Sequence, residues 1–335
     1  MSTSRADRLG AELGRRVPKK HSASYQITTP TIPYWIPTGS VLLDTYIRGG
    51  LTPSGLPCGK FTEFFGPEAS GKTSTWLRVA SGVQRRGGMV VAICPEGLDE
   101  PYANRIHFVD TQDPDKWIYI EPYSLEAALS AIESAVYQFH DADFETLIVL
   151  DSLSVLRAND LTMDHQEINA TEAAAAEAKL LHKFFRRGVL YYMSGSRVSC
   201  LMVRHQTQNP RPYSRSVTTH GSALDFQAWL RIRFRRTKLE FNKKQTGWFI
   251  HLACEKSKLG PDLWRLSIPL YFDGGFDPGM EAICFLLDRK VVKTDRAGYI
   301  VIGDEKRWAS TWRKLYRENE TVRDQIDEMV RNELK

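Results

Sequence analysis

The sequence predicts an α/β fold in which a mostly parallel sheet is flanked by helices. Three observations support this prediction. A glycine-rich loop lies between a short apolar run and an amphipathic stretch, further short apolar runs recur up to residue 203, and helical stretches separate these runs. Strands that alternate with helices form parallel pairs through crossover connections. After residue 221, consecutive strand-like runs predict an antiparallel extension.

The glycine-rich loop, GPEASGKT at residues 66–73, fits the phosphate-binding pattern GxxxxGK[ST]. Glycines allow successive backbone N–H groups to curl around phosphate oxygens, a lysine reaches the terminal phosphates, and the threonine hydroxyl ligates Mg²⁺. A strand at 61–65 and a helix at 73–85 favour this interpretation over a chance match in a turn. The predicted nucleotide ligands are Gly66, Pro67, Glu68, Ala69, Ser70, Gly71, Lys72, Thr73 and Ser74.

The N-terminal segment, residues 1–33, is predicted to contain a helix at 4–17 and a strand at 24–28 within a linker rich in Pro, Ser and Thr. Leu9, Leu13 and Val17 form one apolar stripe, which is too little to sustain so short a helix alone. We therefore expect the helix to dock on its own domain or on another subunit. A hook for polymerisation and a disordered tail both remain open.

The core is predicted to cover residues 34–275. Its expected helices are residues 41–47, 73–85, 100–106, 124–139 and 171–193, and its expected strands are residues 61–65, 89–94, 117–120, 146–150, 199–203, 229–235, 247–254 and 263–270. Residues 276–335 are predicted to form a small C-terminal lobe, with a helix at 279–288 and a charged, helical tail from 304.

Three polar side chains are predicted at the carboxyl ends of parallel strands, where α/β folds bind ligands. Asp151 ends the strand 146–150 and is expected to hold Mg²⁺ together with Thr73; a helix cap is the alternative. Glu96 follows the strand 89–94 and is a candidate for activating water, although a solvated loop glutamate fits equally well. His205 ends the strand 199–203 and is a candidate phosphate sensor, but an isolated histidine is more often structural.

Two long polar segments, residues 157–169 and 206–220, leave the same predicted edge of the sheet. Connections of this length and polarity are usually functional. The second segment mixes basic and aromatic side chains, which suits phosphates and bases. The candidate DNA-binding residues are Arg186, Arg187, Arg211, Tyr213, Arg215 and Gly221. For each single arginine, a solvated surface is the alternative.

Composition indicates the class of protein and the compartment in which it is expected. The 335 residues are 42% hydrophobic and 25% charged, as in an ordinary globular protein, and the net charge of +5 permits nucleic-acid binding without demanding it. The five cysteines form no CxxC pair, which favours reduced thiols in the cytoplasm. Neither a signal peptide nor a membrane-spanning run is recognisable, so no membrane partner is expected.

Six sequence blocks in a fixed order resemble the bacterial RecA recombinase family, including its phage members. The blocks are IPTGSVLLD, GPEASGKTS, CPEGLDEPYA, LIVLDSL, THGSALDF and CEKSKLGP, and the resemblance runs from about residue 36 to the C-terminus. It implies a RecA-like ATPase core and an ATP-dependent, DNA-dependent strand-exchange protein. Such a protein forms helical filaments on single-stranded DNA and pairs it with double-stranded DNA in a bacterial or phage-infected cell.

The resemblance also implies roles for particular residues. Glu96 becomes the water-activating carboxylate, and Asp99 and Tyr102 match the positions that hold adenine. Lys256 and Lys258 match a lysine pair that reaches the neighbouring subunit's γ-phosphate, so that ATP joins the protomers. The two polar segments match the two DNA-binding loops, and residues 1–33 match the polymerisation hook. Single-strand-binding and loading proteins are implied as further partners.

Several positions depart from the family pattern. The usual γ-phosphate sensor is a glutamine, whereas this chain has His205 after Arg204, similar to phage recombinases of the UvsX type. His220 replaces the first glycine of the Gly-Gly that follows the second loop, and Asp225 stands where a lysine is common. Two alternatives therefore stay open. One is a RecA-like ATPase that does not recombine, such as a helicase motor or a regulatory ATPase, and the other is a catalytically weak protein that coats DNA.

Overall fold

The computed structural model describes residues 32–158, 170–207, 217–218, 223–241 and 243–334. The chain divides into two units, residues 1–33 and residues 34–335. The helix predicted at 4–17 and the strand predicted at 24–28 lie outside the described residues. None of the helices within the described ranges is long and apolar enough to cross a membrane.

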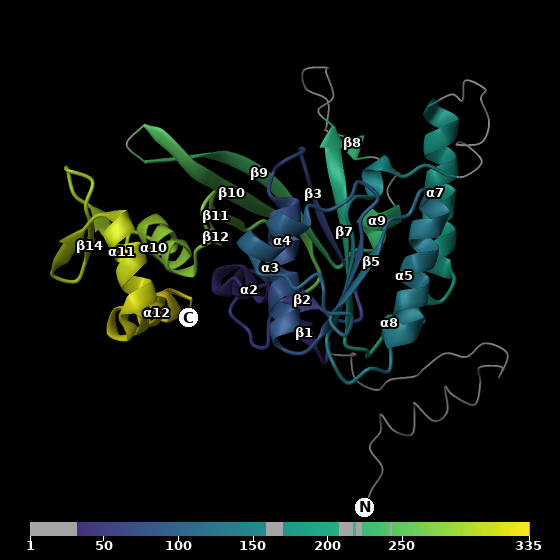
Figure 1. Ribbon diagram of the computed structural model, residues 1–335, viewed down its shortest axis with the longest axis horizontal. Coiled ribbons are helices and arrows are strands. Elements are labelled where there is room, and N and C mark those ends of the chain that lie inside the picture. The colour runs from purple at the N-terminus through teal and green to yellow at the C-terminus, as the bar shows by residue number, and fades with distance from the viewer. Residues whose placement is uncertain (1–31, 159–169, 208–216, 219–222, 242, 335) are drawn as a thin grey trace, which may run out of the picture. The chain divides into compact units, whose positions relative to one another are not determined.

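A ten-stranded sheet forms the centre of the second unit, in the order β12-β11-β10-β9-β3-β7-β6-β4-β5, with β8 added beside β7 (Figure 1). Its parallel strands are β3 (Phe61–Gly66), β4 (Met89–Ile93), β5 (Trp117–Ile120), β6 (Thr146–Leu150), β7 (Val198–Thr207) and β9 (Leu230–Phe241). The antiparallel extension consists of β10 (Lys244–Ser257), β11 (Arg265–Tyr271) and β12 (Gly275–Phe276). The predicted α/β class and its antiparallel extension are confirmed.

Helices cover both faces of the parallel strands, which explains why β4 and β6 are buried throughout. One face packs on α5 (Leu125–Phe139), α7 (Ala170–Arg186), α8 (Val189–Met193) and α9 (Ala223–Gln227) in a single apolar cluster. The other contacts α3 (Lys72–Arg85), which follows the glycine-rich loop and packs beside α4 (Glu100–His107). Alternate strand residues such as Val91 and Ile93 face the first cluster because side chains alternate along a strand.

The single helix predicted over residues 171–193 is wrong, because the chain breaks between α7 and α8. Gly188 has a φ of +94°, a left-handed conformation that favours glycine. The apolar stripe continues through the break, with Phe185 before it and Val189 after it both buried in the same cluster. Periodicity alone therefore concealed the interruption.

The C-terminal lobe, residues 278–334, combines α10 (Pro278–Asp288), α11 (Ala309–Glu318) and α12 (Glu320–Glu333) with a small sheet. This sheet contains β13 (Lys293–Thr294), β14 (Ile300–Ile302) and β15 (Glu305–Arg307). The prediction of helix from residue 304 is thus wrong for β15. Two short strands near the start of the core, β1 (Trp35–Ile36) and β2 (Leu56–Pro57), pair with each other and flank α2 (Val41–Arg48) in the sequence.

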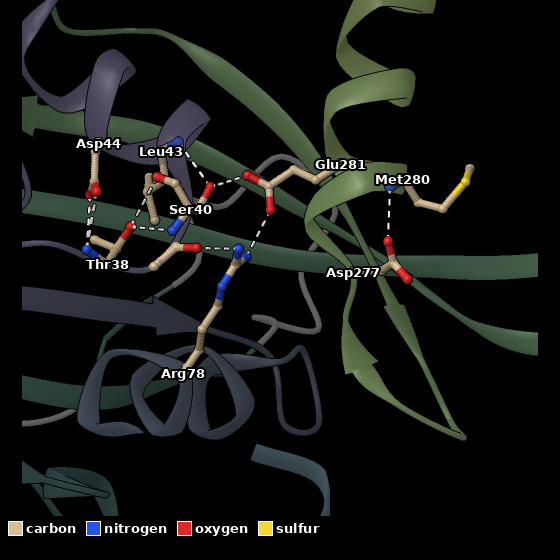
Figure 2. Close-up of polar contacts among 9 residues, drawn as sticks. Thr38, Ser40, Leu43, Asp44, Arg78, Asp277, Met280 and Glu281 are labelled. Atoms are coloured by element: carbon tan, nitrogen blue, oxygen red, sulfur yellow. Dashed lines mark hydrogen bonds and ion pairs between the residues drawn. The ribbon is translucent and has the colours of Figure 1, made fainter. Parts of the chain in front are cut away.

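A buried polar cluster fastens α10 to the helix that follows the glycine-rich loop (Figure 2). Arg78 of α3 lies 2.8 Å from a carboxylate oxygen of Glu281, which is buried, and Ser40 donates to the other oxygen. Asp44 accepts the Thr38 backbone N–H at 3.0 Å, and burial raises the pKa of this carboxyl to about 7. The start of the core, α3 and the C-terminal lobe therefore share one network of charges.

Candidate nucleotide-binding site

The glycine-rich loop connects β3 to α3, and its glycines are required by close packing. A Cβ on Gly66 would lie 2.3 Å from the Phe234 carbonyl oxygen. Gly71 has a φ of +97°, and a Cβ there would lie 2.6 Å from Cδ1 of Ile250. Strands β9 and β10 therefore press against the loop, so the loop is held by tertiary contacts as well as by its own sequence.

Lys72 begins α3 and is only 4% exposed. Its Nζ donates to the carbonyl oxygens of Gly66 at 3.1 Å and Pro67 at 2.7 Å. Burial lowers the pKa of this ammonium to about 8, although Asp151 and Glu96 oppose the shift. The ammonium group of Lys72 therefore lies against the loop. A bound phosphate would stabilise its charged form.

Asp151 follows β6 and meets the first turn of α3. Its Oδ2 accepts a hydrogen bond from Thr73 Oγ1 at 2.6 Å and another from Trp76 Nε1 at 2.7 Å. Burial raises the pKa of Asp151, although the hydrogen bonds from Thr73 and Trp76 and the charge of Lys72 oppose the shift. A hydroxyl and a buried carboxylate side by side are oxygen ligands of the kind Mg²⁺ prefers, so Thr73 and Asp151 fit this metal. The indole N–H of Trp76 holds the carboxylate in place. From the sequence, Trp76 is expected only to pack in the core.

The ends of β4, β6 and β7 bring the predicted carboxylate and sensor together. The His205 Nε2 atom lies 3.4 Å from Glu96 Oε1, and Ser152 Oγ donates to the same oxygen at 2.7 Å. The His205 backbone N–H donates to Ser154 Oγ at 2.7 Å. The Glu96 side chain remains 46% exposed, so water reaches a carboxylate that neighbouring groups hold in position. This arrangement suits activation of a water molecule.

A cavity of about 320 Å³ opens beside the loop and is lined by its residues, by Tyr102 and by His205. Asp99 caps α4 by accepting the Tyr102 N–H at 2.9 Å, while the Tyr102 hydroxyl lies 2.8 Å from Ser74 Oγ. The aromatic ring therefore stands at the cavity wall, as expected for a residue that stacks on a base.

Strands β9, β10 and β11 and the turn after β11 complete the cavity with residues that the sequence did not reveal. These are Arg236, Trp248, Ile250, Leu270, Tyr271 and Phe272. The Arg236 guanidinium lies 3.8 Å from the centre of the Trp248 ring, an arrangement typical of cation–π contacts. No local signal marks these positions, because only the pairing of β9, β10 and β11 brings them to the loop.

The predicted lysine pair lies away from this cavity. Lys256 is opposite Arg231 in the β9–β10 ladder, and Arg231 is opposite Glu63 in β3. Glu63 lies three residues before Gly66, near the middle of β3, so Lys256 is set back from the loop along the strand direction. Neither Lys256 nor Lys258 lines the cavity.

Each lysine instead has contacts within the chain. Lys256 Nζ donates to the carbonyl oxygens of Asp225 at 2.6 Å and Phe226 at 2.9 Å, both in α9. Lys258 Nζ lies 5.5 Å from the centre of the Trp229 ring, and Lys60 Nζ lies 4.3 Å from the same centre. Three cations therefore gather near the start of β3 and β9.

The structure describes only the ends of the predicted DNA-binding loops. The second segment begins inside β7, whose Gln206 and Thr207 pair with β8 (Val217–Thr218), so its ends are held together. Arg211, Tyr213, Arg215 and Gly221 lie outside the described residues.

Arg186 and Arg187, also predicted to bind DNA, lie at the end of α7 and directly after it. The 17 residues of this helix span about 24 Å, so the two arginines are far from its first residue, Ala170. Arg187 lies 3.8 Å from Glu133 of α5, so part of its charge is balanced there.

Comparison with known proteins identifies the family of this chain. The sequence model of the RecA N-terminal domain matches residues 27–277. The RecA protein of Ureaplasma parvum serovar 3 is 31% identical over 263 residues, which cover 77% of this chain and 74% of that protein. The RecA protein of Malacoplasma penetrans is 26% identical and covers 89% of this chain and 88% of its own. The RecA protein of Helicobacter hepaticus is 27% identical, covering 89% of this chain and 84% of its own length. The chain belongs to the RecA family.

Proposed function

We propose that this chain is an ATP-dependent DNA strand-exchange protein that forms helical filaments on single-stranded DNA, with ATP between adjacent copies. One observation carries the proposal. The loop residues, Thr73 and His205 line one cavity, Asp151 and Glu96 contact Thr73 and His205 beside it, and neither Lys256 nor Lys258 lines it. A head-to-tail arrangement would bring the lysines of one copy to the cavity of the next, and such interfaces generate open helices where the rotation does not close a ring.

Within one chain, Lys72 neutralises phosphate charge and Glu96 accepts a proton from the attacking water. Thr73 and Asp151 would hold Mg²⁺, which supplies further positive charge at the phosphates. Ser152 orients Glu96 through its hydrogen bond, and His205 lies close enough to the same oxygen to sense whether the terminal phosphate is present. Tyr102 would stack on the adenine.

Between chains, Lys256 and Lys258 would add charge to the neighbouring nucleotide and close the interface. Loss of the terminal phosphate would remove their ligand and loosen the contact. His205 lies in β7, directly before the second loop, so the same event would alter how the loop holds DNA. Because base pairing reads homology, the loops need only contact phosphates and stack on bases.

A mixing experiment tests the shared site. We expect Lys72→Ala, and separately the double variant Lys256→Ala with Lys258→Ala, to lose ATP turnover on single-stranded DNA. In an equal mixture, about a quarter of the interfaces would join an intact loop to intact lysines, and turnover would recover in proportion. Electron microscopy with a slowly hydrolysed ATP analogue would show filaments for the unaltered protein.

Two results would contradict the proposal. If the mixture stayed as inactive as its components, the lysines would not act across an interface. If the unaltered protein formed closed rings or remained monomeric on DNA with every nucleotide, filament formation would be excluded and a RecA-like ATPase of another kind would be the better interpretation.

A further inference from the structure

Among the residues that the structure describes, four charged side chains form a largely buried cluster that includes the residue before His205. Arg204 and Glu63 are 0% exposed, and Arg204 Nε donates to Glu63 Oε1 at 2.6 Å. Arg204 also pairs with Asp225, while Arg231 pairs with Glu63 and lies 3.1 Å from Asp225. Two arginines and two carboxylates therefore share one site. An arginine keeps its charge even when buried, so each carboxylate is needed to balance it.

The cluster joins elements that belong to different parts of the proposed machinery. Arg204 precedes His205 in β7, and Glu63 lies in β3, which leads into the glycine-rich loop. Asp225 belongs to α9, which follows the second predicted loop in the sequence. The backbone carbonyl of Asp225 also accepts the hydrogen bond from Lys256 Nζ. Arg204 of β7 therefore contacts the side chain of Asp225, and Lys256 contacts its backbone carbonyl.

Helix α9 depends on these contacts for its position. It has only five residues, fewer than an isolated helix needs, and just two of them, Ala223 and Leu224, are buried. Its Asp225 side chain is 29% exposed, so it lies at the margin of the cluster rather than deep inside it. Changing Asp225 would therefore remove one of the contacts that position α9, while Ala223 and Leu224 stayed in the core and Arg204 and Arg231 kept Glu63 as a partner.

We infer that the Arg204–Asp225 ion pair is a positioning contact that transmits the state of the nucleotide site to α9 and to Lys256. The inference rests on the proposed function and deepens it. Coupling between two sites in a protein usually changes the response five- to 150-fold. A contact that only supports the fold would instead lower all activities and the stability together.

The test compares ATP turnover without DNA and with single-stranded DNA. We expect Asp225→Asn to keep its basal turnover and KM for ATP within about twofold, yet to lose about tenfold or more of the stimulation by DNA. Asp225→Glu, which retains the charge, is expected to restore most of that stimulation. The matched control is Glu255→Gln, which breaks an exposed pair with Arg233 at 2.9 Å on the same sheet and should leave both rates unchanged.

The outcomes separate this inference from the function on which it rests. Full stimulation in Asp225→Asn would overturn the inference and leave the proposed function intact. Equal loss of basal turnover, stimulated turnover and thermal stability would also overturn it, because the cluster would then be structural. If the unaltered protein showed no stimulation by DNA, the proposed function would fail and the inference with it.

Discussion

Nucleotide binding is expected to be coupled to proton uptake at Lys72. Its pKa is lowered from 10.5 to about 8, chiefly by burial, so near pH 8 about half of the chains hold this side chain neutral. Phosphate oxygens beside Nζ would return the pKa toward its ordinary value. The difference between the two pKa values corresponds to roughly 3 kcal/mol of stabilisation of the charged lysine, which the bound phosphate would supply. The sign is fixed: affinity for nucleotide falls as the pH rises above about 8.

Isothermal titration calorimetry measures this uptake. Binding of a slowly hydrolysed ATP analogue in buffers of different ionisation enthalpy would give about half a proton taken up at pH 8 and about a tenth at pH 7. Lys72→Arg is the control, because arginine keeps its charge at both pH values. Subtracting its result removes protons exchanged at Asp151 or other groups. Equal proton uptake by the two proteins at pH 8 would refute the reasoning.

Three further predictions concern the surrounding structure. Because burial raises the Asp44 pKa from 3.8 to about 7, the folded chain loses stability as pH rises through that range; Asp44→Asn should increase the unfolding free energy at pH 8 by up to about 4 kcal/mol, measured by denaturant titration. Glu96→Gln should slow turnover about 10²–10⁴-fold while nucleotide binding, followed by fluorescence, is retained. Gly71→Ala should abolish that binding through collision with Ile250, whereas Gly87→Ala, also at positive φ but with no atom within 4 Å of the new Cβ, should bind normally.

The parallel core could be predicted because its signals are local. A glycine-rich loop between a strand and a helix, and a carboxylate at the end of an apolar strand, indicate without tertiary information where phosphates and a metal ion would bind. The pairing between strands that are distant in the sequence could not be predicted. The far wall of the cavity, including Trp248 and Tyr271, depends on the pairing of β9, β10 and β11. Local periodicity likewise missed the break at Gly188 and the strand β15, since both interrupt stretches whose composition favours helix.

Two departures from the family pattern are linked in the structure. A lysine is common in the family where this chain has Asp225, and that exchange looks unrelated to Arg204 in the sequence. In the fold, Asp225 pairs with Arg204 and lies 3.1 Å from Arg231. A lysine there would place a third cation beside Glu63, which carries a single negative charge. An acid at position 225 therefore suits Arg204 better than a lysine would. In this chain an ion pair joins α9 to β7, the strand that carries His205.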